Sequence, residues 1–333
     1  MAAPLSSAQS VRYSISPINA DMVLNKEHIR STVDYLTDPA LGGRATGTEG
    51  AHKAAYWLEG NFRVLGLQPL GGAWLHGFNT SEGMGRNVIG LIPGSSSPAR
   101  YVVLMAHYDN LGYLNGTFYP GADANASGVA ALLELAAMVG RMNTCHKIYR
   151  HSLILVALDG KEKNQAGAVE LWRQIDSKKL LDPVSGQPVS ASQISLVVNL
   201  DQLGGTSAPL TEGNPRFLMM LSDDATAQQS SLEAANRGKG FGLELAYDYY
   251  GSKDFTRLFY RRISDQRIFL EHKIPAVMFT SGITLNNNKP TDNADSLDYD
   301  VLKDRIRLIF YWLDKVLQQR SSAVRLAAFL SSF

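Results

Sequence analysis

Apolar positions follow two patterns along this chain. In some segments they recur at the three- and four-residue spacing of an amphipathic helix, and in others they fill short runs completely. The expected helices cover residues 26–36, 51–65, 127–139, 166–175 and 299–317. The expected strands cover residues 87–92, 101–107, 152–158, 195–201, 217–221 and 275–280. Because fully apolar runs suit strands covered on both faces, we predict an α/β fold with a mostly parallel mixed sheet between helices.

The order of these segments gives no sign of a second domain. The sequence contains no internal repeat and no low-complexity linker. We therefore predict one globular domain over residues 21–320, after a loose arm (1–20) and before an apolar tail (321–333). Three polar stretches, residues 79–85, 182–192 and 206–214, are predicted to be surface loops.

Composition narrows the classes of partner. The 333 residues are 45% hydrophobic and 19% charged, which suits one large core. A formal net charge of +1 gives no general attraction to nucleic acid or anionic membrane, so we expect no nucleic-acid partner. No apolar run reaches 18 residues, since Glu134 interrupts the longest candidate, and we expect no membrane span. Cys145 is the only cysteine, which excludes an internal disulfide and a thiolate-built metal site. Oligomeric state stays open.

Polar side chains follow three of the predicted strands. His107 and Asp109 end or follow one strand, Glu162 follows the next, and Asp201 follows a third. Asp123 lies between the first two strands in a glycine-bounded turn. Ligands of open α/β sheets bind beyond the carboxyl ends of the strands, and a buried carboxylate needs a partner or a metal. We therefore predict a cation site, with zinc favoured over manganese or cobalt, and with Asp109 orienting the His107 imidazole.

Several motifs resemble those of zinc aminopeptidases of metallopeptidase family 28. They are LGGRATGTEG, AHYDNLG, PGADANASG, VALDGKE and NKPTDNADSLDY. The resemblance implies two zinc ions that share a bridging aspartate, here Asp123. It further implies that His107 and Asp201 hold one ion, while Glu162 and a late histidine hold the other. A glutamate before the metal-binding glutamate is the general base of that family. A peptide substrate and a periplasmic or extracellular location are implied as well, although residues 1–10 lack a signal-peptide pattern.

Four positions depart from the family pattern. Lys161 stands at the general-base position, and Asn288 stands where the late histidine is expected. Asp265 is followed by Gln266 instead of a histidine, and Ala124 follows Asp123 where a second aspartate is usual.

The two main departures affect the same half of the predicted metal pair. A lysine beside carboxylates keeps its proton, and loss of general-base catalysis alone costs about 10²–10⁴-fold in rate. We therefore expect one zinc ion or none. We also predict that the Lys161 ammonium occupies or borders the place of the lost ion and neutralises Asp123 and Glu162.

Two functions remain open at this point. The first is a zinc-dependent aminopeptidase homologue of impaired activity, with Asp159, Asp265 or Glu271 as a substitute base. The second is a non-catalytic pseudopeptidase that binds a peptide, a sugar or a protein partner in the retained cleft. Glutaminyl cyclisation is disfavoured, because the zinc that the resemblance implies for it needs the missing late histidine.

Overall fold

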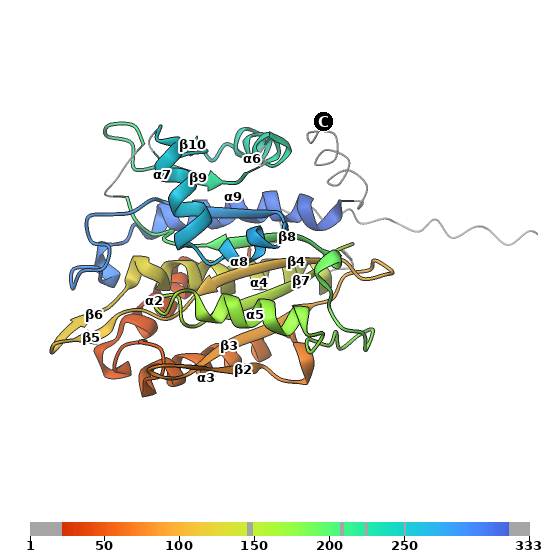
Figure 1. Ribbon diagram of the computed structural model, residues 1–333. Helices are drawn as coiled ribbons and strands as arrows, with labels where there is room; N and C mark the ends of the chain where they lie inside the picture. The colour runs from red at the N-terminus through yellow and green to blue at the C-terminus, as the bar shows by residue number, and fades with distance from the viewer. Residues whose placement is uncertain (1–21, 145–148, 207–209, 224–225, 250, 320–333) are drawn as a thin grey trace, which may run out of the picture.

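Four of the predicted strands lie side by side and parallel at the centre of one sheet (Figure 1). In β4, Val102, Leu104 and Ala106 enter one hydrophobic core, and the residues between them enter a second core on the opposite face. This alternation explains why these runs are apolar at every position. In spatial order the four strands are β7 (Ser152–Leu158), β4 (Tyr101–His107), β8 (Ile194–Leu200) and β11 (Ala276–Thr280).

This computed structural model describes residues 22–144, 149–206, 210–223, 226–249 and 251–319. The predicted arm (1–20), the predicted tail (321–333) and Cys145 lie outside the described residues.

Antiparallel strands extend the sheet on both sides. β3 (Gly83–Ile92) pairs with β7 and also with the edge strands β1 (Gln68–Pro69) and β2 (Leu75–Thr80). On the other side, β9 (Phe217–Leu221) is antiparallel to β11 and parallel to β10 (Glu244–Ala246). Within the described ranges the sheet thus has nine strands and is mixed, as predicted. A separate short hairpin follows β4 and consists of β5 (Gly112–Leu114) and β6 (Thr117–Tyr119).

Helices cover both faces of the sheet (Figure 1). α4 (Ser127–Thr144) packs on β4, β7 and β8 and is flanked by α2 (Lys26–Thr37) and α9 (Tyr299–Gln318). The first turns of α2 and α9 begin at Asn25 and Asp298, whose side chains accept hydrogen bonds from backbone N–H groups. α3 (Glu49–Val64) packs on β3, and α6 (Thr226–Lys239) packs on α9. The opposite face carries α5 (Ala166–Asp176) and α8 (Arg267–Glu271), with α7 (Lys253–Leu258) nearby.

The apolar helix α4 is a core helix. Residues 122–144 are long and apolar enough to cross a membrane by length and composition, yet 89% of the apolar window is buried inside the fold. Packing against the sheet accounts for this composition. The expected absence of a membrane span stays a prediction.

Two parts of the sequence prediction differ from the structure. The predicted loop at residues 79–85 is the turn and flanks of the β2–β3 hairpin, in which Asn79 pairs with Met84 and Thr80 with Gly83. β2 is half-exposed at the sheet edge and the first two residues of β3 are exposed, so this segment carries little apolar pattern. The helices α6, α7 and α8 were not predicted, because their apolar positions are few or their length is short.

Candidate active site

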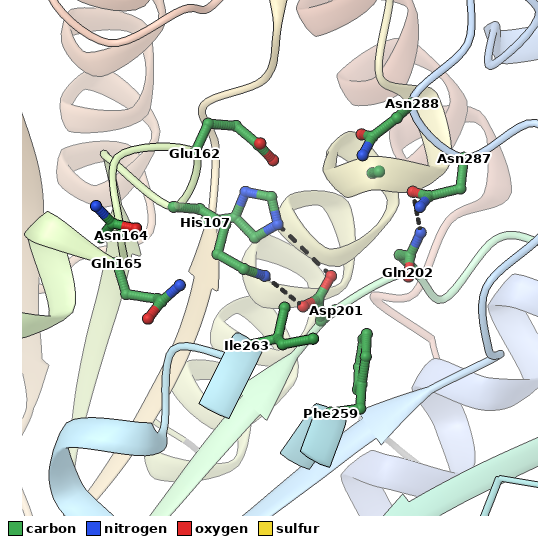
Figure 2. A pocket seen from close by; sticks show the side chains of 12 residues that line it. His107, Glu162, Asn164, Gln165, Asp201, Gln202, Phe259, Ile263, Asn287 and Asn288 are labelled. Carbon is green, nitrogen blue, oxygen red and sulfur yellow. Dashed lines mark hydrogen bonds and ion pairs between the residues drawn. The ribbon is translucent and has the colours of Figure 1, made fainter. Parts of the chain in front are cut away.

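The carboxyl ends of β4, β7 and β8 open into one cleft with a cavity of about 280 Å³ (Figure 2). Parallel pairing of β4 with both neighbours brings the polar residues that follow these strands to one edge of the sheet, as predicted. The cleft is lined by His107, Ala124, Lys161, Glu162, Asn164, Gln165, Asp201, Gln202, Phe259, Ile263, Asn287 and Asn288.

Three charged side chains meet at the floor of the cleft. Oδ1 of Asp201 lies 3.5 Å from Nε2 of His107, a contact that Figure 2 shows. Oδ2 of Asp201 accepts a hydrogen bond of 2.9 Å from Nζ of Lys161. The Lys161 side chain is only 11% exposed, so it does not extend into solvent. The ammonium thus lies in the cleft, and its close carboxylate is Asp201 and not the predicted Asp123.

These contacts change the pKa of each group. Burial and the charge of Lys161 act to lower the pKa of His107, but its contacts with Asp109 and Asp201 outweigh them and raise that pKa to about 10. Burial acts to raise the pKa of Asp201, whereas the charges of Lys161 and His107 hold it well below its usual range. Burial acts to lower the pKa of Lys161, but the charges of Asp201 and Asp265 outweigh it and hold that pKa above its usual range. Lys161 is therefore protonated and positively charged at neutral pH.

Asp109 joins the loops that follow β4 and β7. Its carboxylate is fully buried and accepts hydrogen bonds of 3.0 Å from the backbone N–H groups of Lys161 and Glu162. The same carboxylate lies 3.5 Å from Nδ1 of His107. This geometry suits the predicted orienting role of Asp109, and it also fixes the direction in which Lys161 leaves the backbone.

Asp265 and Gln266 lie behind the cleft and do not line it. Oδ2 of Asp265 is 3.9 Å from Nζ of Lys161, and neither carboxylate oxygen accepts a hydrogen bond from the residues that the structure describes. Burial raises the pKa of Asp265 to about 6, although Lys161 acts in the opposite direction. Gln266 is fully buried in the core, where it accepts a hydrogen bond from Asn199 and donates one to the carbonyl of Tyr260.

Asp123, the predicted bridging ligand, is turned away from the cleft. Its Oδ1 accepts hydrogen bonds from the backbone N–H groups of Gly204 at 2.8 Å and Gly205 at 3.1 Å, and from the Ser127 hydroxyl at 3.2 Å. Its Oδ2 is buried and has no hydrogen-bond partner in the described part of the chain. The next residue, Ala124, lines the cleft instead. The methyl group of Ala124 thus lies where the sequence predicted a shared carboxylate.

Carboxamide side chains dominate the rest of the lining, which sequence reasoning did not predict. Asn164, Gln165, Gln202 and Asn288 all have positive φ, between 55° and 58°. Such backbone costs free energy in residues other than glycine and is concentrated at functional sites. Figure 2 shows Asn288 and Glu162 on different sides of the cavity. No local sequence pattern predicts these positive φ values.

Asp159 and Glu271, the other two predicted substitute bases, lie away from the cleft lining. So does His272, the histidine just before β11. Asp159 is buried and accepts hydrogen bonds from the Thr46 hydroxyl and from the backbone N–H of Arg86. Glu271 lines a separate arginine-rich hollow. The ring of His272 stacks on Trp172 at 4.0 Å between centroids. None of these three residues is among those that line the cleft.

The cleft residues do not fit the predicted zinc ions. Protein zinc sites use three or four nitrogen, sulfur or oxygen donors. Within the described ranges, no group of three or more His, Cys, Asp or Glu side chains is arranged to hold a metal ion. Lys161 occupies one oxygen of Asp201, Ala124 offers no donor, and Asn288 offers an amide.

Comparison with known proteins shows what the fold is related to. The model for peptidase family M28 matches residues 87–313. The uncharacterised protein YfbL of Escherichia coli strain K12 is 26% identical over 82% of this chain and 83% of its own length. A probable zinc metalloprotease of Pyrenophora tritici-repentis is 24% identical over 80% of this chain and 64% of its own.

The solved structures support the same fold. BSAP, a zinc aminopeptidase from Bacillus subtilis, superimposes with a TM-score of 0.67 at 14% identity, covering 90% of this chain and 97% of that one. The fold is therefore that of the zinc aminopeptidases, and zinc is the metal named for these relatives. Because the family model covers most of the folded domain, this chain belongs to peptidase family M28.

Proposed function

We propose that this chain is a non-catalytic member of peptidase family M28 that binds a peptide in the retained cleft without hydrolysing it. The observation that carries the proposal is the 2.9 Å hydrogen bond from Nζ of Lys161 to Oδ2 of Asp201. By the family resemblance, these are the positions of the general base and of a metal ligand. An ammonium group cannot accept a proton from an attacking water, and here it also occupies the carboxylate.

Two further positions support loss of catalysis. Ala124 faces the cleft where a bridging carboxylate would be needed, and Asn288 replaces the late histidine. Zinc prefers imidazole, thiolate and carboxylate ligands, so neither Ala124 nor Asn288 supplies the ligand that is missing at the other position. The same cleft therefore lacks both the base and a sufficient set of metal ligands.

The cleft nevertheless retains groups that suit a peptide. Carboxamides offer both donors and acceptors to peptide N–H and C=O groups, and Phe259 and Ile263 supply an apolar wall for a side chain. Nε2 of Gln202 donates a hydrogen bond of 2.7 Å to Oδ1 of Asn287, which holds that side of the cleft in place. A cavity of about 280 Å³ suits a ligand of two or three small residues.

Hydrolysis and binding are measured separately. The native chain is incubated with aminoacyl-nitroanilides and with a set of tripeptides, each with added zinc, cobalt or manganese. We expect no product above a protein-free blank, while calorimetry detects binding of at least one tripeptide that mass spectrometry shows to be intact. Asn287→Trp fills the cavity and should abolish that binding, whereas Lys289→Trp, at an exposed position outside the cleft lining, should not.

The alternative, an aminopeptidase of impaired activity, makes the opposite prediction. Nitroanilide release that a chelator abolishes would contradict the non-catalytic part of the proposal. If no tripeptide binds, or if Asn287→Trp binds as the native chain does, the cleft is not a peptide site.

A further inference from the structure

We infer that Lys161 is a built-in cation, whose ammonium group takes over the charge role of a metal ion and lets this chain keep its cleft without metal. The inference rests on the proposed loss of the zinc site but not on peptide binding. It is carried by the arrangement of charges around Nζ of Lys161.

Carboxylates outnumber cations at the floor of the cleft. Asp109, Asp201 and Asp265 are buried there, and Glu162 follows Lys161 directly. Buried carboxylates close to one another are costly unless a cation offsets them. The Lys161 ammonium lies 2.9 Å from Asp201 and 3.9 Å from Asp265. Among the described residues neither oxygen of Asp265 has a hydrogen-bond partner, so Asp265 depends on this charge.

The backbone sets this position for Lys161. Gly160, with a φ of 76°, turns the chain after β7, and the N–H of Lys161 is held by Asp109 at 3.0 Å. Lys163, two residues further on, provides a contrast. Its ammonium pairs with Glu82, whose side chain is 54% exposed, and that pair lies at the surface. The two lysines therefore have different environments. Lys161 contacts buried carboxylates at the cleft, whereas Lys163 forms an ion pair at the surface.

Removal of Lys161 would leave two donors spaced like ligands of one metal ion. Nε2 of His107 and Oδ1 of Asp201 are 3.5 Å apart. Two ligands of a tetrahedral zinc with bonds of about 2.1 Å are separated by about 3.4 Å. Glu162 lines the same cleft, but among the described residues no group of three His, Cys, Asp or Glu side chains is arranged to hold a metal ion. The ammonium therefore supplies, beside this pair, the positive charge that a bound cation would otherwise supply.

The test compares Lys161→Met with the native chain and with Lys163→Met as matched control. Melting temperature is recorded after chelator treatment and after addition of zinc, and bound zinc is measured after dialysis. The native chain and Lys163→Met should melt within about 1 °C with chelator or zinc and retain far less than one zinc per chain. Lys161→Met should melt about 6–10 °C lower than the native chain in chelator, and excess zinc should restore part of this loss by supplying a positive charge beside Asp201.

Three outcomes would overturn the inference. A native chain that retains one zinc or melts earlier in chelator holds a metal of its own. A Lys161→Met chain that is as stable as the native chain and indifferent to zinc shows that the cation is dispensable. If Lys161→Met does not fold, Lys161→Met/Asp265→Asn should restore folded protein, because it removes a carboxylate left without its partner; continued failure to fold also overturns the inference. Peptidase activity is not the readout, so either proposal can fail alone.

Discussion

Oδ1 of Asp292 accepts a hydrogen bond of 2.7 Å from the backbone N–H of Asp123. Its other oxygen accepts from the N–H of Ala124 at 3.1 Å. Two segments that are 169 residues apart in the sequence are thus joined at the cleft. The joint fixes the turn before α4, and it decides that Ala124 faces the cavity while Asp123 faces the backbone of Gly204 and Gly205.

We predict that Asp292→Ala destabilises the fold by about 2–4 kcal/mol, because two buried charge-assisted hydrogen bonds are lost. Asp292→Asn keeps one acceptor oxygen and should cost about half as much. Urea unfolding followed by circular dichroism measures both. Equal stability of Asp292→Ala and the native chain would show that the turn does not depend on this carboxylate.

Arg44 is the second buried support of the cleft. Its guanidinium is fully buried and donates to the backbone carbonyls of Leu36, Tyr108, Pro120 and Gly121. Lysine has three donors on one nitrogen and cannot reach carbonyls in several directions. Arg44→Lys should therefore cost about 2–4 kcal/mol in urea unfolding. Arg30→Lys, at an exposed ion pair with Asp295, is the control and should leave the unfolding midpoint unchanged.

The sequence predicted the central strands well, because burial on both faces of a sheet leaves a pattern that is local. It also predicted that His107, Asp201 and Glu162 meet at one cleft, since parallel strands bring their carboxyl ends together. It placed Asp123 in that cleft, whereas the adjacent residue Ala124 is the one that lines it. A contact from Asp292 decides this, and a one-residue offset within a turn has no periodic signal.

Local sequence patterns also did not identify the carboxylates that contact Lys161. Its charge predicted a carboxylate neighbour, but the closest ones, Asp201 and Asp265, come from other parts of the chain. The carboxamide lining depends on positive φ at residues such as Gln202, which tertiary contacts impose.

Glu134 makes stability depend on pH. It is 6% exposed within α4, and its Oε2 has no hydrogen-bond partner within the ranges that the structure describes. Burial raises its pKa to about 7. In the unfolded chain the value is about 4.3, so between these values the folded state binds more protons. Its stability contribution therefore falls as pH rises from about 4 to 7.

We predict that Glu134→Gln removes this dependence. The variant should be about 1–3 kcal/mol more stable than the native chain at pH 8, and the difference should shrink towards pH 4. Thermal melts at several pH values measure it. A difference that is constant with pH, or one that grows towards acid, would contradict the role given to Glu134.

Two glycines of α4 should respond in opposite directions to the same substitution. A Cβ on Gly128 would lie 2.3 Å from Oδ1 of Asn125 and 2.7 Å from the carbonyl of Leu200. Asn125 donates to the carbonyl of Leu200 and accepts from the N–H of Gln202, so displacement of its side chain would disturb the end of β8. A Cβ on Gly140 would meet nothing closer than 3.8 Å.

Gly128→Ala should therefore destabilise the chain by about 1–3 kcal/mol, because the clash involves backbone that cannot give way. Gly140→Ala should stabilise it by about 0.5–1 kcal/mol, since this partly buried helix position has room for a Cβ and alanine has the higher helix propensity. Urea unfolding of the two variants beside the native chain measures the contrast. If both substitutions shift the midpoint in the same direction, helix propensity and not the approach of α4 to β8 governs these positions.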